Sequence, residues 1–231
     1  MKKLATLLAA AALLAVAVNA AFAANAVRIS QAYGGGGGSG YYLYDYVELY
    51  NSTNAAVSVG GDYLEYGSAT GNWGSSTGNI YQIPANTMIQ PCSYLLIQLG
   101  AAGTAGAALP VTPDLVTANL SMSQSTGKVG LFTALDSNGA CGTEAGIVVD
   151  KVAWGTSNCY EGTGAAGGTT NQSAVVRLQG GQTDNDNNAA DFTVVTSPVP
   201  HNSASPANPN GPCGTVPTLN KTWGTLKSIY R

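Results

Sequence analysis

The chain consists largely of short segments in which apolar and polar residues alternate, and this pattern limits its fold more than any other feature. The segments cover residues 26–33, 42–51, 56–59, 62–67, 79–84, 93–100, 128–133, 147–154, 174–178 and 192–195. Clusters of Gly, Asn, Ser, Thr and Pro separate them. A period of two is typical of strands with one buried face, so the sequence predicts an all-β fold, either an antiparallel sandwich or a barrel. Each sheet is expected to have one buried and one solvated face.

Long helices are not expected after the signal peptide. Residues 115–122 are compatible with a helical turn or a strand, and residues 226–230 with a short helix. Charged residues make up 9% of the chain and Gly contributes 30 of the 231 residues, which excludes a coiled coil and a charge-rich disordered chain. With only 9 Lys and Arg residues, the chain is not a polybasic nucleic-acid binder.

Residues 1–23 have the organisation of a secretory signal peptide. Lys2 and Lys3 precede an apolar stretch that is too short for a membrane anchor, and residues 21–23 form a small-x-small cleavage site. Cleavage after Ala23 leaves 7 basic and 12 acidic residues, a net charge of −5 that repels nucleic acid at long range. No later segment approaches 18 apolar residues, so we expect a secreted or cell-surface protein without a transmembrane segment.

Four cysteines remain after cleavage: Cys92, Cys141, Cys159 and Cys213. An even number in an exported chain predicts two disulfides, and four cysteines allow three pairings. None of the four lies in a CxxC motif or beside a histidine, which argues against a zinc site.

Several motifs, taken in order, resemble the lamin tail domain as it occurs in secreted bacterial proteins. The motifs are VRISQAYGGGGGSG (27–40), YDYVELYNSTNAAVSVGG (44–61), YLEYGSATG (63–71), SYLLIQ (93–98), TGKVGLF (126–132), GACG (139–142), IVVDKVAWGTSNCYEG (147–162) and VVRLQGGQTDNDNNAADFTVV (175–195). Each motif alone is weak, whereas their order and spacing over roughly residues 27–200 are specific. The resemblance implies an immunoglobulin-like antiparallel β-sandwich over residues 24–200, used for binding or tethering. Residues 201–231 then form a Pro/Asn/Ser-rich linker and a C-terminal tail.

The resemblance also implies how the cysteines pair. Cys141 and Cys159 match the usual cysteine pair of the family. The other two, Cys92 and Cys213, are additions to the family pattern and pair with each other. A bridge that closes so long a loop would pin the tail to the sandwich and stabilise the fold by about 2–4 kcal/mol.

The sequence offers little for covalent catalysis. General-base and nucleophilic sites most often use histidine, and the only histidine, His201, lies in SPVPHNSAS, where an exposed linker residue is expected. The acids are scattered one or two to a strand, and Asp45 and Glu48, three residues apart, point to opposite faces. No catalytic residue and no organic cofactor is therefore predicted.

The best metal candidate is the segment TDNDNNAADF (183–192). It offers closely spaced oxygen ligands that suit Ca²⁺, from Asp184, Asp186, Asn188 and Asp191. It lacks the Gly and the distant bidentate Glu of an EF-hand loop. The alternative is a loop whose Asp and Asn side chains hydrogen-bond their own backbone.

Six of the 12 tyrosines lie between residues 33 and 50. Aromatic side chains in a row on a sheet can bind a sugar, a base or a protein, and the candidate binding residues are Tyr42, Tyr44, Tyr46 and Tyr50. The alternative is a set of half-buried strand tyrosines with solvated hydroxyl groups. Because no basic residue lies between residues 29 and 127, a protein or a glycan is favoured over nucleic acid.

These observations predict a secreted, non-catalytic binding module. It would contact a protein or a glycan at the cell surface or in the extracellular matrix, or assist a separate exported enzyme. Two alternatives stay open: a hydrolase that uses carboxylates alone, and an extracellular structural subunit that assembles through its edge strands. The C-terminal TWGTLKSIYR is either a docking tag or a strap packed on the sandwich.

Overall fold

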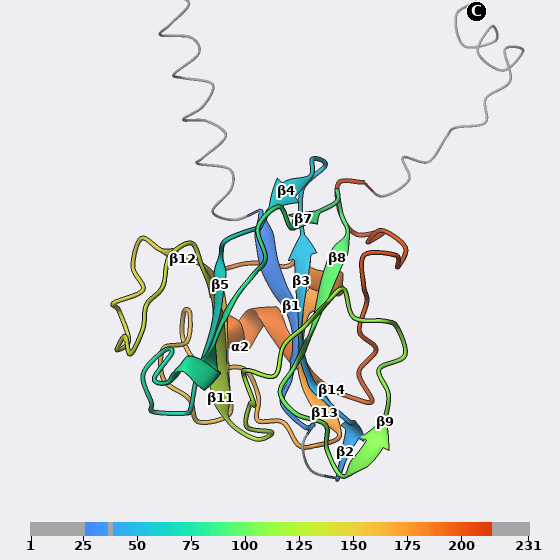
Figure 1. Cartoon of the computed structure of the whole chain (residues 1–231). Helices are drawn as coiled ribbons and strands as arrows, with labels where there is room; N and C mark the ends of the chain where they lie inside the picture. Colours follow the sequence, from blue (N-terminus) through green and yellow to red (C-terminus); the bar gives the residue numbers. More distant parts are fainter. Residues whose placement is uncertain (1–25, 37–38, 214–231) are drawn as a thin grey trace, which may run out of the picture.

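The computed structural model describes residues 26–36 and 39–213. The signal peptide, the C-terminal TWGTLKSIYR and the short helix expected at residues 226–230 lie outside the described residues. In the described part the chain is almost entirely strands and loops, as the alternating pattern predicts (Figure 1). No helix in this part is long and apolar enough to cross a membrane.

Each of the ten predicted segments contains a strand. The strands of the described residues are β1 (Val27–Tyr33), β2 (Ser39–Tyr42), β3 (Asp45–Asn51), β4 (Val57–Ser58), β5 (Tyr63–Gly67), β6 (Ile80–Gln82), β7 (Met88–Ile89), β8 (Tyr94–Leu99), β9 (Ala105–Ala107), β10 (Leu115–Val116), β11 (Gly127–Phe132), β12 (Val148–Trp154), β13 (Ser173–Arg177) and β14 (Phe192–Thr196). Three short helices accompany them: η1 (Thr77–Asn79), η2 (Leu178–Gly181) and α2 (Asn188–Asp191). Residues 115–122, for which the sequence left a turn or a strand open, begin with β10.

The strands form a sandwich of two main sheets. One sheet has six strands in the order β10-β8-β3-β1-β13-β14, and the other has four in the order β12-β11-β5-β6. Neighbours within these sheets are antiparallel, except that β10 pairs with β8 in parallel. The small sheets β2-β9 and β4-β7 lie at opposite ends of the sandwich (Figure 1). Of the two architectures that the alternation allowed, the chain therefore adopts the sandwich.

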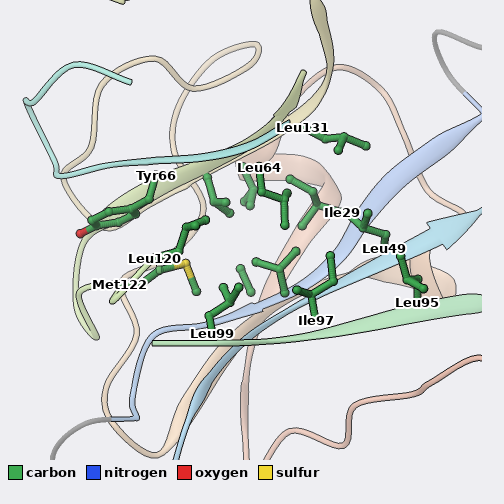
Figure 2. Close-up of a cluster of buried hydrophobic side chains, with 14 of the residues drawn as sticks. Ile29, Leu49, Leu64, Tyr66, Leu95, Ile97, Leu99, Leu120, Met122 and Leu131 are labelled. Carbon is green, nitrogen blue, oxygen red and sulfur yellow. The ribbon is translucent and has the colours of Figure 1, made fainter. Parts of the chain in front are cut away.

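The main hydrophobic core lies between the two sheets (Figure 2). Val47 and Leu49 of β3 and Ile29 of β1 face Leu64 of β5 and Leu131 of β11, and all five side chains are fully buried. Burying one such side chain contributes about 1.5–3 kcal/mol to stability. The alternation in residues 42–51 predicts Leu43, Val47 and Leu49 on one face of the strand. Val47 and Leu49 of this apolar face pack on the second sheet.

The other face of the six-stranded sheet is also buried over its central strands β1, β3 and β8, which corrects the expectation of one solvated face. Every residue of β3 is buried, on both sides of the strand. Residues 198–213, here called the cover segment, leave β14 and run along the outside of this sheet (Figure 1). Leu109 and Val111 pack beside a second apolar cluster on the same face.

Hydrogen bonds fix the cover segment to the sheet. The Tyr42 hydroxyl donates to the Pro198 carbonyl at 2.7 Å, and the Gln31 amide donates to the Val199 carbonyl at 3.0 Å. The buried amide of Asn208 donates to two carbonyl groups of η2. The first part of the predicted linker, up to residue 213, therefore belongs to the folded sandwich.

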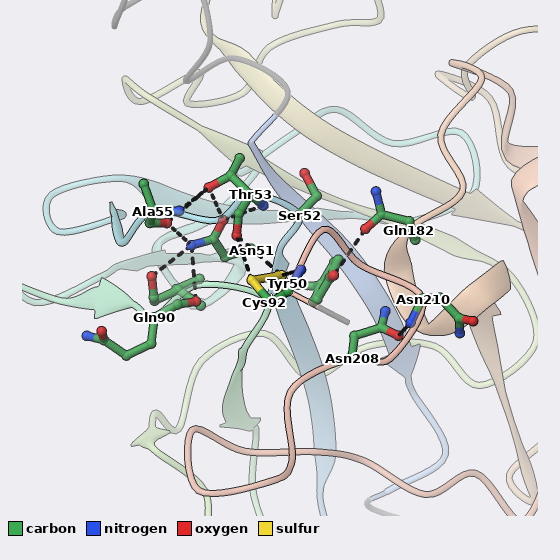
Figure 3. Close-up of a disulfide and its surroundings, with 12 residues drawn as sticks. Tyr50, Asn51, Ser52, Thr53, Ala55, Gln90, Cys92, Gln182, Asn208 and Asn210 are labelled. Carbon is green, nitrogen blue, oxygen red and sulfur yellow. Dashed lines mark hydrogen bonds between the residues drawn. A yellow bond between two sulfur atoms is a disulfide. The ribbon is translucent and has the colours of Figure 1, made fainter. Parts of the chain in front are cut away.

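Both disulfides join the pairs that the resemblance implies. Cys92 and Cys213, with Cα atoms 5.9 Å apart, hold the end of the cover segment beside the start of β8 (Figure 3). Cys141 and Cys159, with Cα atoms 5.1 Å apart, join the loops on either side of β12. All four cysteines are thus oxidised.

The two disulfides should differ in how much they stabilise the fold. The bond from Cys92 closes a sequence separation of 121 residues, and the bond from Cys141 closes 18. Because the entropy removed from the unfolded chain grows with loop length, we expect the double substitution Cys92→Ser/Cys213→Ser to cost about 4 kcal/mol, and Cys141→Ser/Cys159→Ser about 3 kcal/mol. Urea unfolding of the two variants measures both. An equal or larger cost for the shorter loop would contradict the expectation.

Candidate functional site

The predicted tyrosine row does not form an exposed binding face. Tyr42, Tyr46 and Tyr50 are 5%, 0% and 0% exposed, and only Tyr44 of the four candidates is partly exposed. The Tyr46 hydroxyl is not solvated either, because it donates to the Gln31 side chain at 2.9 Å. The first three residues are therefore unavailable to a ligand, which corrects the prediction for them.

Tyr42 and Tyr46 instead form a second core with Tyr33, whereas Tyr50 packs on Tyr94 with ring centroids 5.1 Å apart. The Tyr33 ring stacks on Tyr46 with ring centroids 5.4 Å apart. Its hydroxyl donates to the Asn171 carbonyl at 2.7 Å and accepts the N–H groups of Tyr41 and Tyr42 at 2.8 and 3.1 Å. A buried tyrosine of this kind packs with its ring and uses its hydroxyl to tie loops to the sheet.

A buried carboxylate meets the only histidine beneath the cover segment. Glu48 of β3 is 1% exposed and accepts hydrogen bonds from the Ser30 hydroxyl at 2.6 Å and the Gln31 amide at 3.2 Å. It also accepts the backbone N–H of His201, whose ring Nδ1 lies 3.2 Å from the carboxylate. The ring stacks on Tyr94 with centroids 4.6 Å apart. His201, expected to be an exposed linker residue, is thus half-buried and paired.

The geometry around His201 is not that of an activated nucleophile. The Ser30 hydroxyl donates to Glu48 and not to the imidazole, so the histidine is not placed to accept the serine proton. The hydrogen bond to Glu48 raises the pKa of His201, and burial opposes this shift only in part. When the imidazole is protonated, it forms an ion pair with Glu48 that holds the cover segment on the sheet.

The four residues predicted to bind Ca²⁺ do not form one site, although Asp184 and Asp191 both lie near Arg177 Nη1, at 3.1 and 3.8 Å. Asp184 pairs with two arginines, Asp186 is exposed, and Asn188 points inward and accepts the N–H of Ala153 in β12. Asp191 accepts hydrogen bonds from the backbone and side chains of the loop itself. Within residues 26–36 and 39–213, no three His, Cys, Asp or Glu side chains form a group that could hold a metal ion. Of the four residues, Asp191 has the Asx pattern, because it accepts the backbone N–H groups of Asn185 and Asn187 in its own loop.

A buried ion cluster lies where β13 ends. The fully buried Arg177 contacts the Asp150 carboxylate of β12 at 2.6 and 2.8 Å and Asp184 at 3.1 Å. Arg177 Nε donates to the Ile29 carbonyl at 2.9 Å, and the Ile29 N–H donates to Asp150 at 2.5 Å. Arg28 pairs with Asp184 at 3.0 Å. Since β12 and β13 belong to different sheets, this cluster joins the two layers.

A further acid beside the cluster has an unusual pKa. Burial raises the pKa of Glu161 to about 8, and the charge of Asp150 adds to the shift. Its carboxylate accepts a hydrogen bond from the Asn188 amide at 3.0 Å, whereas the nearby Lys151 pairs with Glu144 at 2.7 Å. Raised acid pKa values occur at catalytic sites and in structural ion clusters. Around Glu161, Lys151 pairs with Glu144 and Asp150 pairs with Arg177, which is the pattern of a structural ion cluster.

The outer face of the four-stranded sheet carries another buried cation. Lys128 Nζ donates to the carbonyl groups of Ser68 and Gly71 at 3.0 and 2.5 Å and to the Asn158 side chain at 2.7 Å. It lies 5.4 Å from the ring centroid of Trp73, which is fully buried. Burial lowers the pKa of Lys128 to about 8. The Lys128 ammonium group therefore holds the loop of residues 68–71 over the sheet.

A shallow surface hollow is lined only by small, uncharged residues. Its volume is about 530 Å³, and its lining residues are Ser125, Thr126, Gly155, Thr156, Gly168 and Thr169. The Thr126 hydroxyl contacts the Trp154 carbonyl at 3.2 Å and the Thr156 hydroxyl at 3.3 Å, and the Thr169 hydroxyl donates to the Gln124 carbonyl. Four hydroxyl groups and no charge line the hollow, so it suits a neutral ligand that can exchange hydrogen bonds.

No motif in the sequence indicates this hollow directly. Its lining comes from three loops, and the pairing of Gly127 in β11 with Trp154 in β12 brings the first two together. The only local signal is a run of Gly, Ser and Thr beside a strand end, and this composition recurs throughout the chain. Local patterns therefore could not separate these loops from the others.

Comparisons with known proteins identify one family. A model of the lamin tail domain matches residues 20–156, more than half of the chain. None of the curated proteins matches. Among solved structures, the crystal structure of a DUF4876 family protein from Bacteroides thetaiotaomicron is similar, with a TM-score of 0.48 and 12% identity, over 76% of this chain and 72% of that chain.

The Glu48–His201 pair predicts a specific pH dependence. Because the folded-state pKa of His201 is raised, its contribution to stability is complete below the unfolded pKa, about 6.5, and is lost as the pH rises through the folded value. The difference in unfolding free energy between the wild type and His201→Gln should therefore be larger at low than at high pH. Since the chain has one histidine, a single ring signal reports the pKa by NMR. The control Glu48→Gln should lower it; a wild-type value below 6.5 would contradict the prediction.

The ion cluster predicts an asymmetric mutational cycle. Arg177→Met leaves the Asp150 carboxylate buried without its main partner, so we expect a loss of about 3–5 kcal/mol in chemical denaturation. Adding Asp150→Asn removes that charge and should restore part of the loss. Asp186→Asn, at an exposed position of the same loop, should change stability by less than about 0.5 kcal/mol. A double variant less stable than Arg177→Met alone would refute this account.

Proposed function

The chain belongs to the lamin tail domain family, and from this premise we propose that it is an exported, non-catalytic binding module for a neutral glycan. The fold that supports this is the all-β sandwich with its two disulfides. The observation that carries the proposal is the hydroxyl-lined hollow around Thr156. Sugars present many hydroxyl groups and no charge, so the chemistry of the lining suits them.

The distribution of charge supports a neutral ligand. The described residues contain four cationic side chains besides the histidine, and each of them is partnered within the fold: Arg28, Lys128, Lys151 and Arg177. A polyanion such as nucleic acid needs several free cations in one groove or patch. This part of the chain offers such a ligand no free cation, whereas a neutral polar ligand needs none.

The positions of the acids favour binding over hydrolysis. A carboxylate hydrolase needs two acids across a cleft about 5–10 Å apart. The buried acids of the cluster are engaged with arginines and backbone N–H groups, and the lining of the hollow includes no acid. Glu48 is engaged in the same way with His201 beneath the cover segment.

Location outside the cytoplasm rests on two features of the chain. Oxidised pairs such as Cys92–Cys213 persist in exported proteins and are rare in reducing compartments. The N-terminal residues 1–23 have the organisation of a signal peptide. Export would also bring the hollow into contact with the extracellular glycans that we propose as ligands.

The proposal is tested with an array of immobilised neutral oligosaccharides. We expect the purified protein to bind at least one of them, and Thr156→Arg to weaken that binding roughly tenfold or more, because a bulky charge then enters an uncharged site. The matched control is Thr104→Arg, at an exposed position outside the hollow, which should bind like the wild type. Absence of binding to every oligosaccharide, or unchanged binding by Thr156→Arg, would reject the assignment.

A further inference from the structure

The two main sheets have four edges, and three of them are blocked within the described residues. At one edge, β10 has only two residues. Just before β10, Asp114 forms hydrogen bonds with both the N–H and the C=O of Leu96 in the adjacent β8. At another, β6 has three residues, and the Asn119 side chain caps the Ile80 carbonyl. At the third, Asn188 and Ala166 hydrogen-bond the outer side of β12.

The fourth edge, β14, is open. The strand has the sequence FTVVT and carries neither a charge nor a proline, and four of its five residues are β-branched. Val194 is 39% exposed, and Thr193 and Thr196 are also exposed. Charges, prolines and very short length are the usual means by which proteins keep an edge strand from pairing with another chain. This strand has none of them.

Successive residues of β14 direct their backbone N–H and C=O groups to opposite sides of the strand. The hydrogen bonds at its two ends show which residues face which side. The Ser197 N–H bonds to the Gln172 carbonyl, across the β13 side. The Phe192 N–H bonds to Asn188 of α2 and so does not face β13. In an antiparallel pair, successive residues direct their N–H and C=O groups to opposite sides. Residues 193 and 195 therefore face β13, and residues 194 and 196 face outward.

No other described residue bonds these outward groups, so Val194 and Thr196 present free donors and acceptors to the solvent. We infer that β14 is an interface for a second copy of this chain, which pairs with it antiparallel about a twofold axis at Val194. In that arrangement the N–H and C=O of Val194 bond reciprocally to those of its copy. The Thr196 N–H meets the Phe192 carbonyl of the other chain. This inference is independent of the proposed function.

The chemistry of the strand favours an identical partner. The chain carries a formal net charge of −3, so two copies repel one another wherever their charged surfaces meet. An uncharged strand avoids this repulsion at the contact. The twofold axis places Val194 opposite itself, Thr193 opposite Val195 and Phe192 opposite Thr196, which are pairs that stabilise sheets. Because the other three edges are blocked, the assembly closes as a dimer and does not extend into a filament.

Sedimentation equilibrium of the purified protein tests the interface. We expect a mass that approaches twice that of the chain with rising concentration. Val194→Lys places two like charges opposite each other at the axis and should weaken association roughly tenfold or more. The matched control is Val116→Lys, the same substitution at an exposed residue of the opposite edge, which should associate like the wild type. Melting at low concentration checks that both variants are folded.

A cross-linking experiment gives a second readout that does not depend on affinity. In a hydrogen-bonded antiparallel pair, opposite Cα atoms are about 5.5 Å apart. A short thiol-reactive cross-linker should therefore join two copies of Val194→Cys and leave Val116→Cys monomeric. A wild type that stays monomeric in the millimolar range, a mass beyond the dimer, or equal association by Val194→Lys would overturn the inference. So would a monomer that takes up an added extended peptide at β14.

Discussion

The ion pair between Arg177 and Asp150 is the interaction on which the arrangement of the two sheets most depends. The ladder between β1 and β13 reaches Gln31 and Val176, and a bulge follows in β1 between residues 29 and 31. Beyond this point, at Ile29, charged side chains take the place of backbone hydrogen bonds between β1 and β13. Arg177 binds the carbonyl of Ile29, and Asp150 binds its N–H. The two backbone polar groups of Ile29 are thus bound by charged side chains from both layers. Burial keeps water from competing for these contacts.

The cover segment changes the character of the six-stranded sheet. An antiparallel sheet in a small sandwich normally has a solvated outer face. Here residues 198–213 bring a histidine, several carbonyl groups and a disulfide onto that face, and its tyrosines become core residues. The buried Glu48 is tolerated because Ser30, Gln31 and His201 satisfy its oxygens. The sheet therefore has two cores, one apolar and one rich in hydrogen bonds.

Local sequence patterns predicted the strands well, because alternation depends only on neighbouring residues. All ten segments contain strands, and Val47 and Leu49 lie on the predicted apolar face. The prediction that the other face of β3 is solvated was wrong. The alternating pattern is the same whether Tyr46 contacts water or another part of the chain. The contact of Glu48 with His201 spans 153 residues, and no local pattern reports on such a distance. The hollow was missed for the same reason.

The bond between Cys92 and Cys213 also determines how the molecule would carry tension. The two ends of the described chain lie near the same turn, because Ser52 binds the Ala26 carbonyl and the Cys213 sulfur lies 3.7 Å from the Thr53 carbonyl. A force applied at both ends passes from Cys213 directly to Cys92 and bypasses the chain between them, which spans a sequence separation of 121 residues. Only the part before Cys92 can be drawn out. The module would therefore lengthen by a limited amount and then resist further stretching, because the Cys92–Cys213 disulfide is covalent.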